Sequence, residues 1–202
     1  MLVVIEYGVG NLFSLTSSLK HIGIDAVTSS DPEIIRSADK LILPGVGAFR
    51  DAKAALEKTG LDAVIKEEAA KGKPIMGICL GMQMLFERSF EYGEYEGLGL
   101  IPGDIVPIAD YIPDNLKIPQ IGWNSLDIRK DTPLFKYIED GDFVYFVHSY
   151  FAKTSEDYII AETEYGAPLT AACQNGNVYG CQFHPEKSER VGLAILKAFD
   201  EL

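Results

Sequence analysis

The chain has 202 residues, of which 47% are hydrophobic and 24% are charged, a composition typical of one ordinary folded domain. Lysine and arginine total 18 against 30 acidic residues, so the formal net charge is −12. This acidity argues against nucleic-acid backbones and anionic membranes as partners, and no apolar run reaches the roughly 18 residues of a membrane span.

The first half of the chain alternates short apolar runs with helical stretches. Residues 2–6 are predicted as a strand, and no basic region precedes them as in a secretory signal. Asn11 is placed to cap a helix with apolar positions from Leu12 to Ile22, which Gly23 ends. Further strands are predicted over residues 24–28, 41–43 and 74–78, and helices near 49–58 and 61–71.

The second half has shorter, alternating runs punctuated by proline and glycine. Residues 143–147, 158–161 and 177–181 are predicted as strands in hairpin-like order. A last helix, which Ser188 could cap, carries Val191, Ile195 and Phe199 on one face. We therefore expect a single α/β domain over residues 1–202, with an open, mostly parallel sheet, helices on both faces and an antiparallel extension in the second half.

The chain has three cysteines, Cys79, Cys173 and Cys181. An odd count without a short Cys-x-x-Cys pair argues against a disulfide framework and a zinc site. We expect a reducing, cytoplasmic setting, no metal ion and no other cofactor. One of these thiols could therefore serve as a catalytic nucleophile.

Cys79 lies in the pattern Gly77-Ile78-Cys79-Leu80-Gly81, between an apolar strand and a helix. Glycines two positions away on each side are typical of a nucleophile elbow, here with cysteine in place of serine. The turn would place the thiol at the start of a helix, where the backbone amide of Leu80 could donate to an oxyanion. Alternatively, Cys79 is a small buried apolar residue, as most free cysteines are.

A thiol nucleophile needs a base, and the chain has three histidines. His21 falls late in the first helix and is expected at the surface, and His148 follows an apolar strand. His184 is two residues before Glu186, so in extended chain the two side chains would point the same way, and Pro185 would help to hold that extension. With the elbow cysteine, this pair predicts a Cys-His-Glu triad; alone, it would be an ordinary ion pair on an edge strand.

The glycine-rich loop Pro44-Gly45-Val46-Gly47 follows the third apolar run. Glycine lets a backbone approach a ligand closely, so this loop could supply a second oxyanion donor. The alternatives are an ordinary strand-to-helix turn and a phosphate-binding loop, although no Lys-Ser/Thr follows it.

The order of PGVG (44–47), GICLGMQ (77–83) and QFHPEKS (182–188) resembles the class I, or triad, glutamine amidotransferase family over essentially the whole chain. Within this family, YGVGN (7–11), IGWN (121–124) and YFVHSY (145–150) are similar to the glutaminase subunits of imidazole glycerol phosphate synthases, enzymes of histidine biosynthesis.

The resemblance implies that L-glutamine is hydrolysed to glutamate and ammonia through a thioester on Cys79, with His184 and Glu186 completing the triad. It implies an oxyanion hole formed by Leu80, Val46 and Gly47. It also implies the following substrate-binding residues: Gly47, Gln83, Glu91, His148, Ser149 and Tyr150. Glu91 could equally be a solvated acid at a helix end.

The resemblance further implies a partner, a separate (β/α)8-barrel cyclase subunit that receives the ammonia. This subunit would make imidazole glycerol phosphate and the aminoimidazole-carboxamide ribonucleotide. The implied interface residues are Asn11, Trp123, Tyr145 and Lys187. Because glycines permit a peptide flip, we also expect the PGVG loop to be a switch that the partner sets.

The sequence leaves three alternatives open. A cysteine peptidase or hydrolase could use the same elbow, and a sister amidotransferase could feed a different synthase. A catalytically silent interaction subunit belongs to another class, and the intact Cys79, His184 and Glu186 argue against it.

Overall fold

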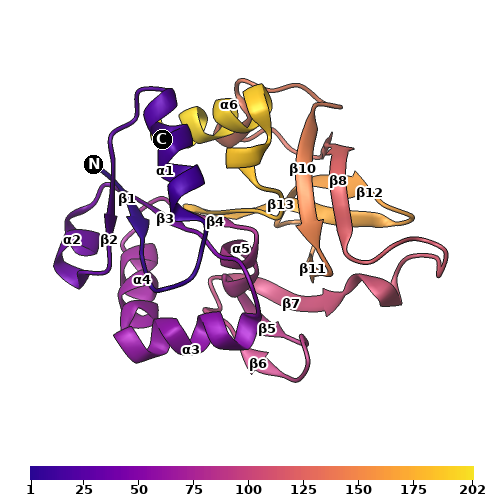
Figure 1. The fold of residues 1–202 in the computed structure, drawn as a ribbon, viewed down its shortest axis with the longest axis horizontal. Coiled ribbons are helices and arrows are strands. Elements are labelled where there is room, and N and C mark those ends of the chain that lie inside the picture. Colours follow the sequence, from indigo (N-terminus) through magenta and orange to yellow (C-terminus); the bar gives the residue numbers. More distant parts are fainter.

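The computed structural model describes residues 1–202 and is built around an eight-stranded sheet (Figure 1). Five neighbouring strands pair in parallel in the order β2 (Ala26–Ser29), β1 (Leu2–Ile5), β3 (Lys40–Leu43), β4 (Ile75–Ile78) and β14 (Val178–Cys181). The sheet continues in antiparallel fashion through β13 (Pro168–Asn175), β12 (Ile159–Glu164) and β9 (Asp127–Ile128). This arrangement confirms the predicted mostly parallel sheet with an antiparallel extension.

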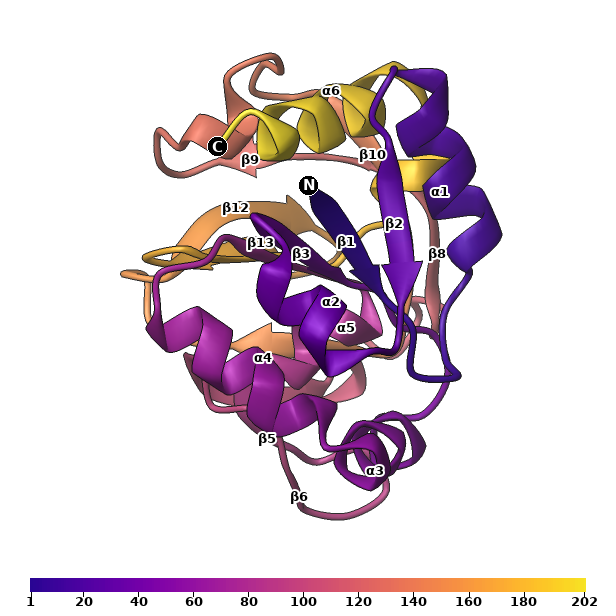
Figure 2. The ribbon, with the colours of Figure 1, turned by 90° about the vertical axis from the view of Figure 1, so that its left-hand side faces the viewer.

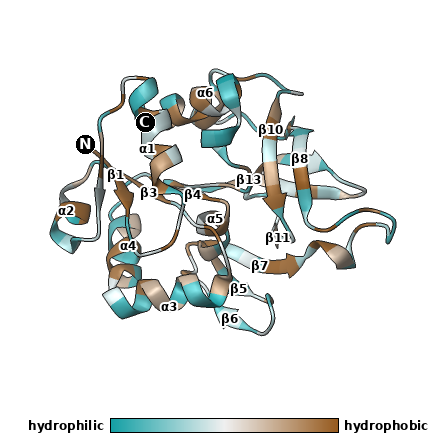
Figure 3. Ribbon diagram, in the orientation of Figure 1, coloured by the Kyte–Doolittle hydropathy of each residue, from teal (hydrophilic) through white to brown (hydrophobic).

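Helices cover both faces of this sheet. Figure 2 shows α1 (Leu12–His21) and α6 (Glu189–Asp200) on one side, with α3 (Phe49–Thr59) and α4 (Leu61–Ala70) on the other. Strand residues alternate between two apolar cores, Val3 facing the α3 and α4 side and Val4 the α1 and α6 side. Strand β1 is accordingly hydrophobic along its whole length (Figure 3).

Two smaller sheets flank the large one. The first has the order β11 (Tyr150–Lys153), β7 (Ile101–Pro107), β5 (Phe86–Ser89) and β6 (Tyr95–Glu96). The second is a hairpin-like pair of β10 (Phe143–His148) and β8 (Gln120–Ser125). Short 3-10 helices lie at Ile108–Asp110, Pro133–Phe135 and Pro185–Lys187.

The two predicted helix caps have different outcomes. Asn11 caps α1, since its side-chain oxygen accepts a hydrogen bond from the Ser14 amide at 3.3 Å. Ser188 precedes α6, but the predicted side-chain cap is wrong. Its hydroxyl instead donates to the His184 carbonyl at 2.6 Å and accepts from the Tyr145 amide at 2.9 Å, so it joins β10 to the turn after His184.

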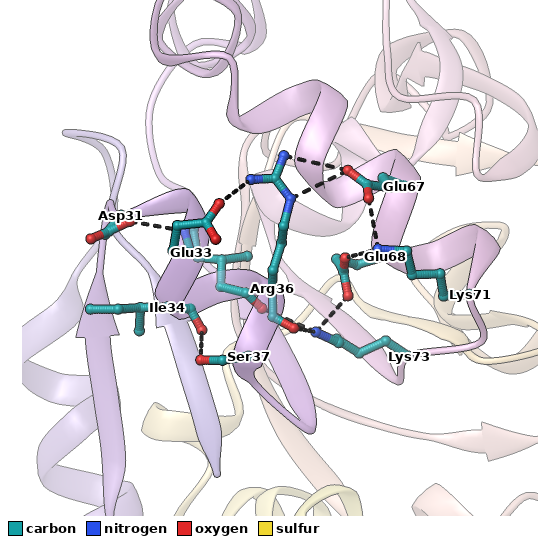
Figure 4. Close-up of polar contacts among 10 residues, drawn as sticks. Asp31, Glu33, Ile34, Arg36, Ser37, Glu67, Glu68, Lys71 and Lys73 are labelled. Carbon is teal, nitrogen blue, oxygen red and sulfur yellow. Dashed lines mark hydrogen bonds and ion pairs between the residues drawn. The ribbon is translucent and has the colours of Figure 1, made fainter.

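A short helix, α2 (Pro32–Ser37), was not predicted, because six residues carry too little apolar periodicity. Asp31 caps it by accepting from the Glu33 amide at 2.8 Å. Arg36 then pairs with Glu33 and with Glu67 of α4 (Figure 4). This polar cluster holds α2 against α4.

The same cluster contains Glu68, whose side chain is only 3% exposed between Lys71 and Lys73 (Figure 4). Burial would raise the pKa of the Glu68 carboxyl, but hydrogen bonds from Lys71 and Lys73 outweigh it and lower that pKa. Glu68 is therefore a paired buried charge on α4. None of the helices combines the length and the apolar character that crossing a membrane would require.

Candidate active site

Cys79 occupies a strained turn between β4 and α5 (Leu80–Met84). Its φ is 54° and its ψ −113°, a conformation that side-chain-bearing residues rarely adopt and that costs about 1–3 kcal/mol. The Cys79 amide donates to the Cys181 carbonyl of β14 at 2.7 Å, which fixes the turn to the sheet. The predicted strand-elbow-helix geometry is confirmed, and Leu80 is the first residue of the helix, with an amide that the helix itself cannot pair.

The elbow glycines are required because backbone packs directly on backbone. A Cβ atom at Gly77 would lie 2.6 Å from the Gly81 carbonyl oxygen, and one at Gly81 would lie 1.9 Å from the Leu43 carbonyl oxygen. A Cβ atom at Gly45 would lie 2.7 Å from the Gly81 amide nitrogen. The elbow and the PGVG loop after β3 are therefore in close contact.

The PGVG loop is anchored at one end and open at the other. The buried Tyr7 hydroxyl donates to the Pro44 carbonyl at 2.6 Å. Val46 and Gly47 are exposed, and Gly47 has a φ of +97°, which a side chain would strain. The loop thus lies beside the elbow, and its outer two residues have room to turn.

His184 and Glu186 are in contact, with Nδ1 and Oε1 2.8 Å apart and side chains only 2% and 4% exposed. The expected reason for this contact is wrong. Pro185–Lys187 forms a 3-10 turn and not extended chain, and that turn brings the Glu186 carboxylate back to the imidazole. The buried Nε2 atom of His184 and the Oε2 atom of Glu186 have no hydrogen-bond partner.

The electrostatics of His184 are set by its neighbours. Burial would lower its pKa, but the polar and charge interactions with the nearby Cys79 sulfur and with Glu186 outweigh burial and raise the pKa to about 9. His184 is thus favoured as an imidazolium beside the sulfur. Such a cation supports a thiolate, which is the nucleophilic form of cysteine.

The other two cysteines have different surroundings. Cys173 and Cys181 are completely buried, and burial raises the pKa of each thiol. Cys79 is 8% exposed and is the thiol next to His184.

We expect iodoacetamide to label Cys79 and to spare Cys173 and Cys181 in the folded chain, because only Cys79 combines access with a cationic neighbour. Peptide mapping by mass spectrometry would measure this selectivity, with a denatured sample, in which all three thiols react, as the control. Faster labelling of Cys173 or Cys181 than of Cys79 would contradict the assignment of the reactive thiol.

Two of the expected substrate-binding residues, Gln83 and Tyr150, are joined by a hydrogen bond. Gln83 is buried, and its Nε2 donates to the Tyr150 carbonyl and to the Gln182 side-chain oxygen, both at 3.0 Å. Glu91 lies between β5 and β6, where its carboxylate accepts from the Phe49 amide at 2.6 Å. Glu91 therefore caps α3, the helix that follows the PGVG loop.

Residues 148–150 connect β10 to β11 beside Cys79. The Cys79 sulfur lies 4.0 Å from the Val147 carbonyl oxygen, and the Ser149 carbonyl accepts from the Ile108 amide at 3.0 Å. His148 is buried, with Nδ1 2.8 Å from the Tyr150 carbonyl oxygen and Nε2 2.9 Å from the side-chain amide of Gln120. Burial lowers the pKa of His148 to about 4, so it is neutral at pH 7.

The buried neutral state of His148 predicts a loss of stability in acid. Between pH 6.5 and about 4 the unfolded chain gains a proton that the folded His148 does not, so the free energy of unfolding falls as the pH drops. The full difference is on the order of 3 kcal/mol. Urea unfolding across this window should show a shallower acid slope for His148→Gln than for the wild type. Parallel slopes for the two proteins would contradict the buried neutral histidine.

Trp123 and Tyr145 lie opposite each other on β8 and β10, with ring centroids 5.9 Å apart. Trp123 is 44% exposed, and Ile121 and Phe143, on the same face of this two-stranded sheet, are also exposed. Asn11 and Lys187 are exposed as well. Ile121 and Phe143 were not predicted from the sequence, although strand alternation places them on the same face as Trp123 and Tyr145.

The backbone of Tyr145 also connects to the histidine of the site. Its carbonyl accepts from the His184 amide at 2.9 Å, and its own amide donates to Ser188. The exposed aromatic strand and His184 therefore share a direct hydrogen-bonded contact. Gln182 is a further residue of the site that the sequence analysis missed. It is fully buried, with its Nε2 3.8 Å from the Cys79 sulfur, and its only sequence signal is a polar residue within an apolar run.

Comparisons with known proteins agree on one family. The class-I glutamine amidotransferase family matches residues 3–200. Imidazole glycerol phosphate synthase subunit HisH of Caldanaerobacter subterraneus subsp. tengcongensis is 52% identical and aligns over 100% of this chain and 98% of that protein. The proteins of the same name from Listeria monocytogenes and Oceanobacillus iheyensis are 48% and 45% identical, over 100% of this chain and 96% and 99% of theirs.

Solved structures agree on the fold. A glutamine amidotransferase crystal structure superposes with a TM-score of 0.76 at 19% identity, covering 98% of both chains. PurLQS from Thermotoga maritima superposes with a TM-score of 0.75 at 22% identity, covering 99% of this chain and 97% of that one.

Proposed function

Because this chain belongs to the class I glutamine amidotransferase family, we propose that it is the glutaminase subunit of an imidazole glycerol phosphate synthase in histidine biosynthesis. Relatives with that name align over its whole length at 45–52% identity. The observation that carries the chemistry is a strained elbow cysteine, Cys79, beside the buried pair of His184 and Glu186. Its three unbridged cysteines fit a reducing compartment such as the cytoplasm.

In this proposal His184 acts first as base and then as acid. Its Nε2 holds the proton given up by Cys79, which is the imidazolium form favoured beside the sulfur, and the thiolate sulfur attacks the side-chain carbonyl carbon of L-glutamine. The tetrahedral oxyanion accepts hydrogen bonds from the Leu80 amide and from an amide of Val46 or Gly47. His184 then protonates the leaving ammonia, and water, giving a proton to His184, hydrolyses the γ-glutamyl thioester to glutamate. Glu186 holds the imidazole by accepting from Nδ1 throughout.

The α-amino and α-carboxylate groups of glutamine would bind near Cys79, away from the side-chain amide that reacts. Glu91 would accept from the substrate ammonium, while Gly47, Gln83 and the backbone of residues 148–150 would complete the pocket. The Glu91 carboxylate already accepts from the Phe49 amide, and Phe49 is only two residues beyond Gly47. The substrate ammonium would therefore bind to a carboxylate that is already hydrogen-bonded to the segment following the PGVG loop.

The ammonia would pass to a (β/α)8-barrel cyclase subunit, which converts it with a phosphorylated ribonucleotide to imidazole glycerol phosphate and the aminoimidazole-carboxamide ribonucleotide. Asn11, Trp123, Tyr145 and Lys187 would face that subunit. The direct backbone contact between Tyr145 and His184 supports a coupling between the partner and the triad. Docking could thereby set the catalytic geometry, including the PGVG loop.

Ammonia release from L-glutamine, with and without the cyclase subunit and its nucleotide, tests this function. For the isolated chain we expect equal amounts of glutamate and free ammonia. In the complex with the nucleotide we expect faster glutamate formation, with the ammonia incorporated into the cyclase product. Cleavage of peptides without ammonia release from glutamine would instead support a cysteine peptidase. Equal rates for the isolated chain and the complex would contradict the proposed coupling.

A further inference from the structure

A chain of buried amide groups leads to the sulfur of Cys79. The Tyr150 carbonyl accepts from Gln83 Nε2 at 3.0 Å, and Gln83 Nε2 also donates to Gln182 Oε1 at 3.0 Å. Gln182 Nε2 then lies 3.8 Å from the Cys79 sulfur. Gln182 is fully buried at the end of β14, and the triad chemistry described above gives it no role.

The backbone carbonyl at one end of this chain fixes the direction of every amide in it. The Tyr150 carbonyl can only accept, so Gln83 must turn its nitrogen toward that oxygen. The nitrogen of Gln83 in turn needs an acceptor on Gln182, so the oxygen of Gln182 faces Gln83. The nitrogen of Gln182 is therefore the end that faces the sulfur.

The Cys79 sulfur consequently has two polar neighbours that favour opposite protonation states. The Val147 carbonyl oxygen, 4.0 Å away, can accept from the thiol and favours its protonated form. The Gln182 amide nitrogen can donate, and a donor is bound more strongly by a thiolate than by a neutral sulfur. In a buried setting such a hydrogen bond is little weakened by solvent.

We propose that Gln182 is a catalytic residue, which donates a hydrogen bond to the Cys79 sulfur and stabilises its thiolate, and that Gln83 is the positioning residue that fixes the direction of the Gln182 amide. This inference rests on the proposed glutaminase function. When His184 Nε2 takes the proton of Cys79, the sulfur loses its contact to the Val147 carbonyl and keeps the one from Gln182. The amide thus holds negative charge on sulfur without itself exchanging a proton.

The titratable groups near the Cys79 sulfur differ in charge at pH 7. His184, with Glu186 behind it, is the cation beside Cys79. Burial raises the pKa of Tyr7, and burial lowers that of His148, so both of these side chains are neutral at pH 7. Once it holds the proton of Cys79, His184 is therefore the cation beside the sulfur, whereas Gln182 is a neutral donor.

The test is the pH dependence of Cys79 alkylation by iodoacetamide in the full-length chain. Gln182→Met keeps the length of the side chain and removes the donor. Gln182→Glu keeps an acceptor for Gln83 and removes the donor to sulfur. A hydrogen bond to a charged group corresponds to about one pH unit or more, so the alkylation midpoint should rise by about one unit in Gln182→Met and further in Gln182→Glu.

Ammonia release gives a second readout. We expect kcat at pH 7 to fall about tenfold in Gln182→Met with KM for glutamine unchanged, and the loss to shrink as the pH rises above the new midpoint. A merely structural role would not be rescued by alkaline pH. Gln174→Met is the matched control, since Gln174 lies on the neighbouring strand β13 and bonds to Thr132 and Gly176. Gln174→Met should leave the pH dependence of alkylation and the pH dependence of kcat unchanged.

Alkylation profiles of the Gln182 variants that superpose on that of the wild type would overturn the inference, and either variant that folds suffices to decide it. The two proposals can fail separately. If wild-type protein releases no ammonia from glutamine while the alkylation midpoint shifts, the glutaminase proposal fails and the thiolate donor remains. If wild-type protein is an active glutaminase and the midpoint does not move, only the role of Gln182 fails.

Discussion

Ammonia release from glutamine should fall by about ten-thousand-fold or more in Cys79→Ala, with the fold retained. A nucleophile and its base act as a unit, so losing the sulfur removes the covalent route altogether and leaves only the oxyanion donors and substrate binding. Alanine keeps the Cβ atom and so demands the same strained backbone at φ 54°. The measurement is the glutaminase rate in the complex with the cyclase subunit, together with the thermal midpoint of the chain.

Cys173→Ala is the matched control for this prediction. Cys173 is a completely buried thiol on β13 whose pKa is raised by burial, so it should contribute packing and no chemistry. We expect its loss to cost about 1 kcal/mol of stability and to leave the glutaminase rate unchanged. Retention of activity in Cys79→Ala would favour the catalytically silent interaction subunit over the enzyme.

The second large effect is expected at the elbow, where Gly81→Ala should destabilise the chain by about 4 kcal/mol or more. The new Cβ atom would stand 1.9 Å from the Leu43 carbonyl oxygen, and neither backbone can move without separating β3 from α5. Overpacking of this kind is among the few causes of such large losses. Urea unfolding at neutral pH measures the difference.

Gly176→Ala provides the comparison. Gly176 has a φ of +57°, and a Cβ atom there would have no neighbour within 4 Å, so alanine would cost only about 1–2 kcal/mol for the left-handed conformation. A Gly81→Ala chain that unfolds at the same urea concentration as Gly176→Ala would contradict the close packing of the elbow on the PGVG loop.

Local sequence patterns were enough to predict the elbow. Glycines at 77 and 81 around Cys79 follow an apolar strand, and each leaves room for the backbone of a neighbouring segment. The parallel strands were also predictable, since β1, β3 and β4 are buried on both faces and therefore read as continuous apolar runs.

The pairing of His184 with Glu186 was predicted for the wrong reason. Proline is compatible with both extended chain and the first residue of a 3-10 turn, so sequence alone did not separate the two backbones. The side chains meet because the turn after Pro185 returns the carboxylate to the imidazole, and Ser188 secures that turn through the His184 carbonyl.

Beyond the Cys79–His184 pair and the PGVG loop beside the elbow, hydrogen bonds between distant segments could not be predicted. Gln83 and Gln182 are 99 residues apart, and only the parallel register of β4 and β14 brings them together. Glu91 caps α3 at Phe49, 42 residues earlier. A single sequence gives the type of such residues but not their partners, so the network around the sulfur became visible only in the fold.

The proposed glutaminase chemistry requires a covalent intermediate on the sulfur of Cys79. Rapid quenching of the complex during glutamine turnover, followed by peptide mapping, should find a γ-glutamyl thioester on the peptide that contains Cys79, and hydroxylamine should release it. Steady ammonia release with no adduct on Cys79, or with the adduct on another residue, would contradict the account.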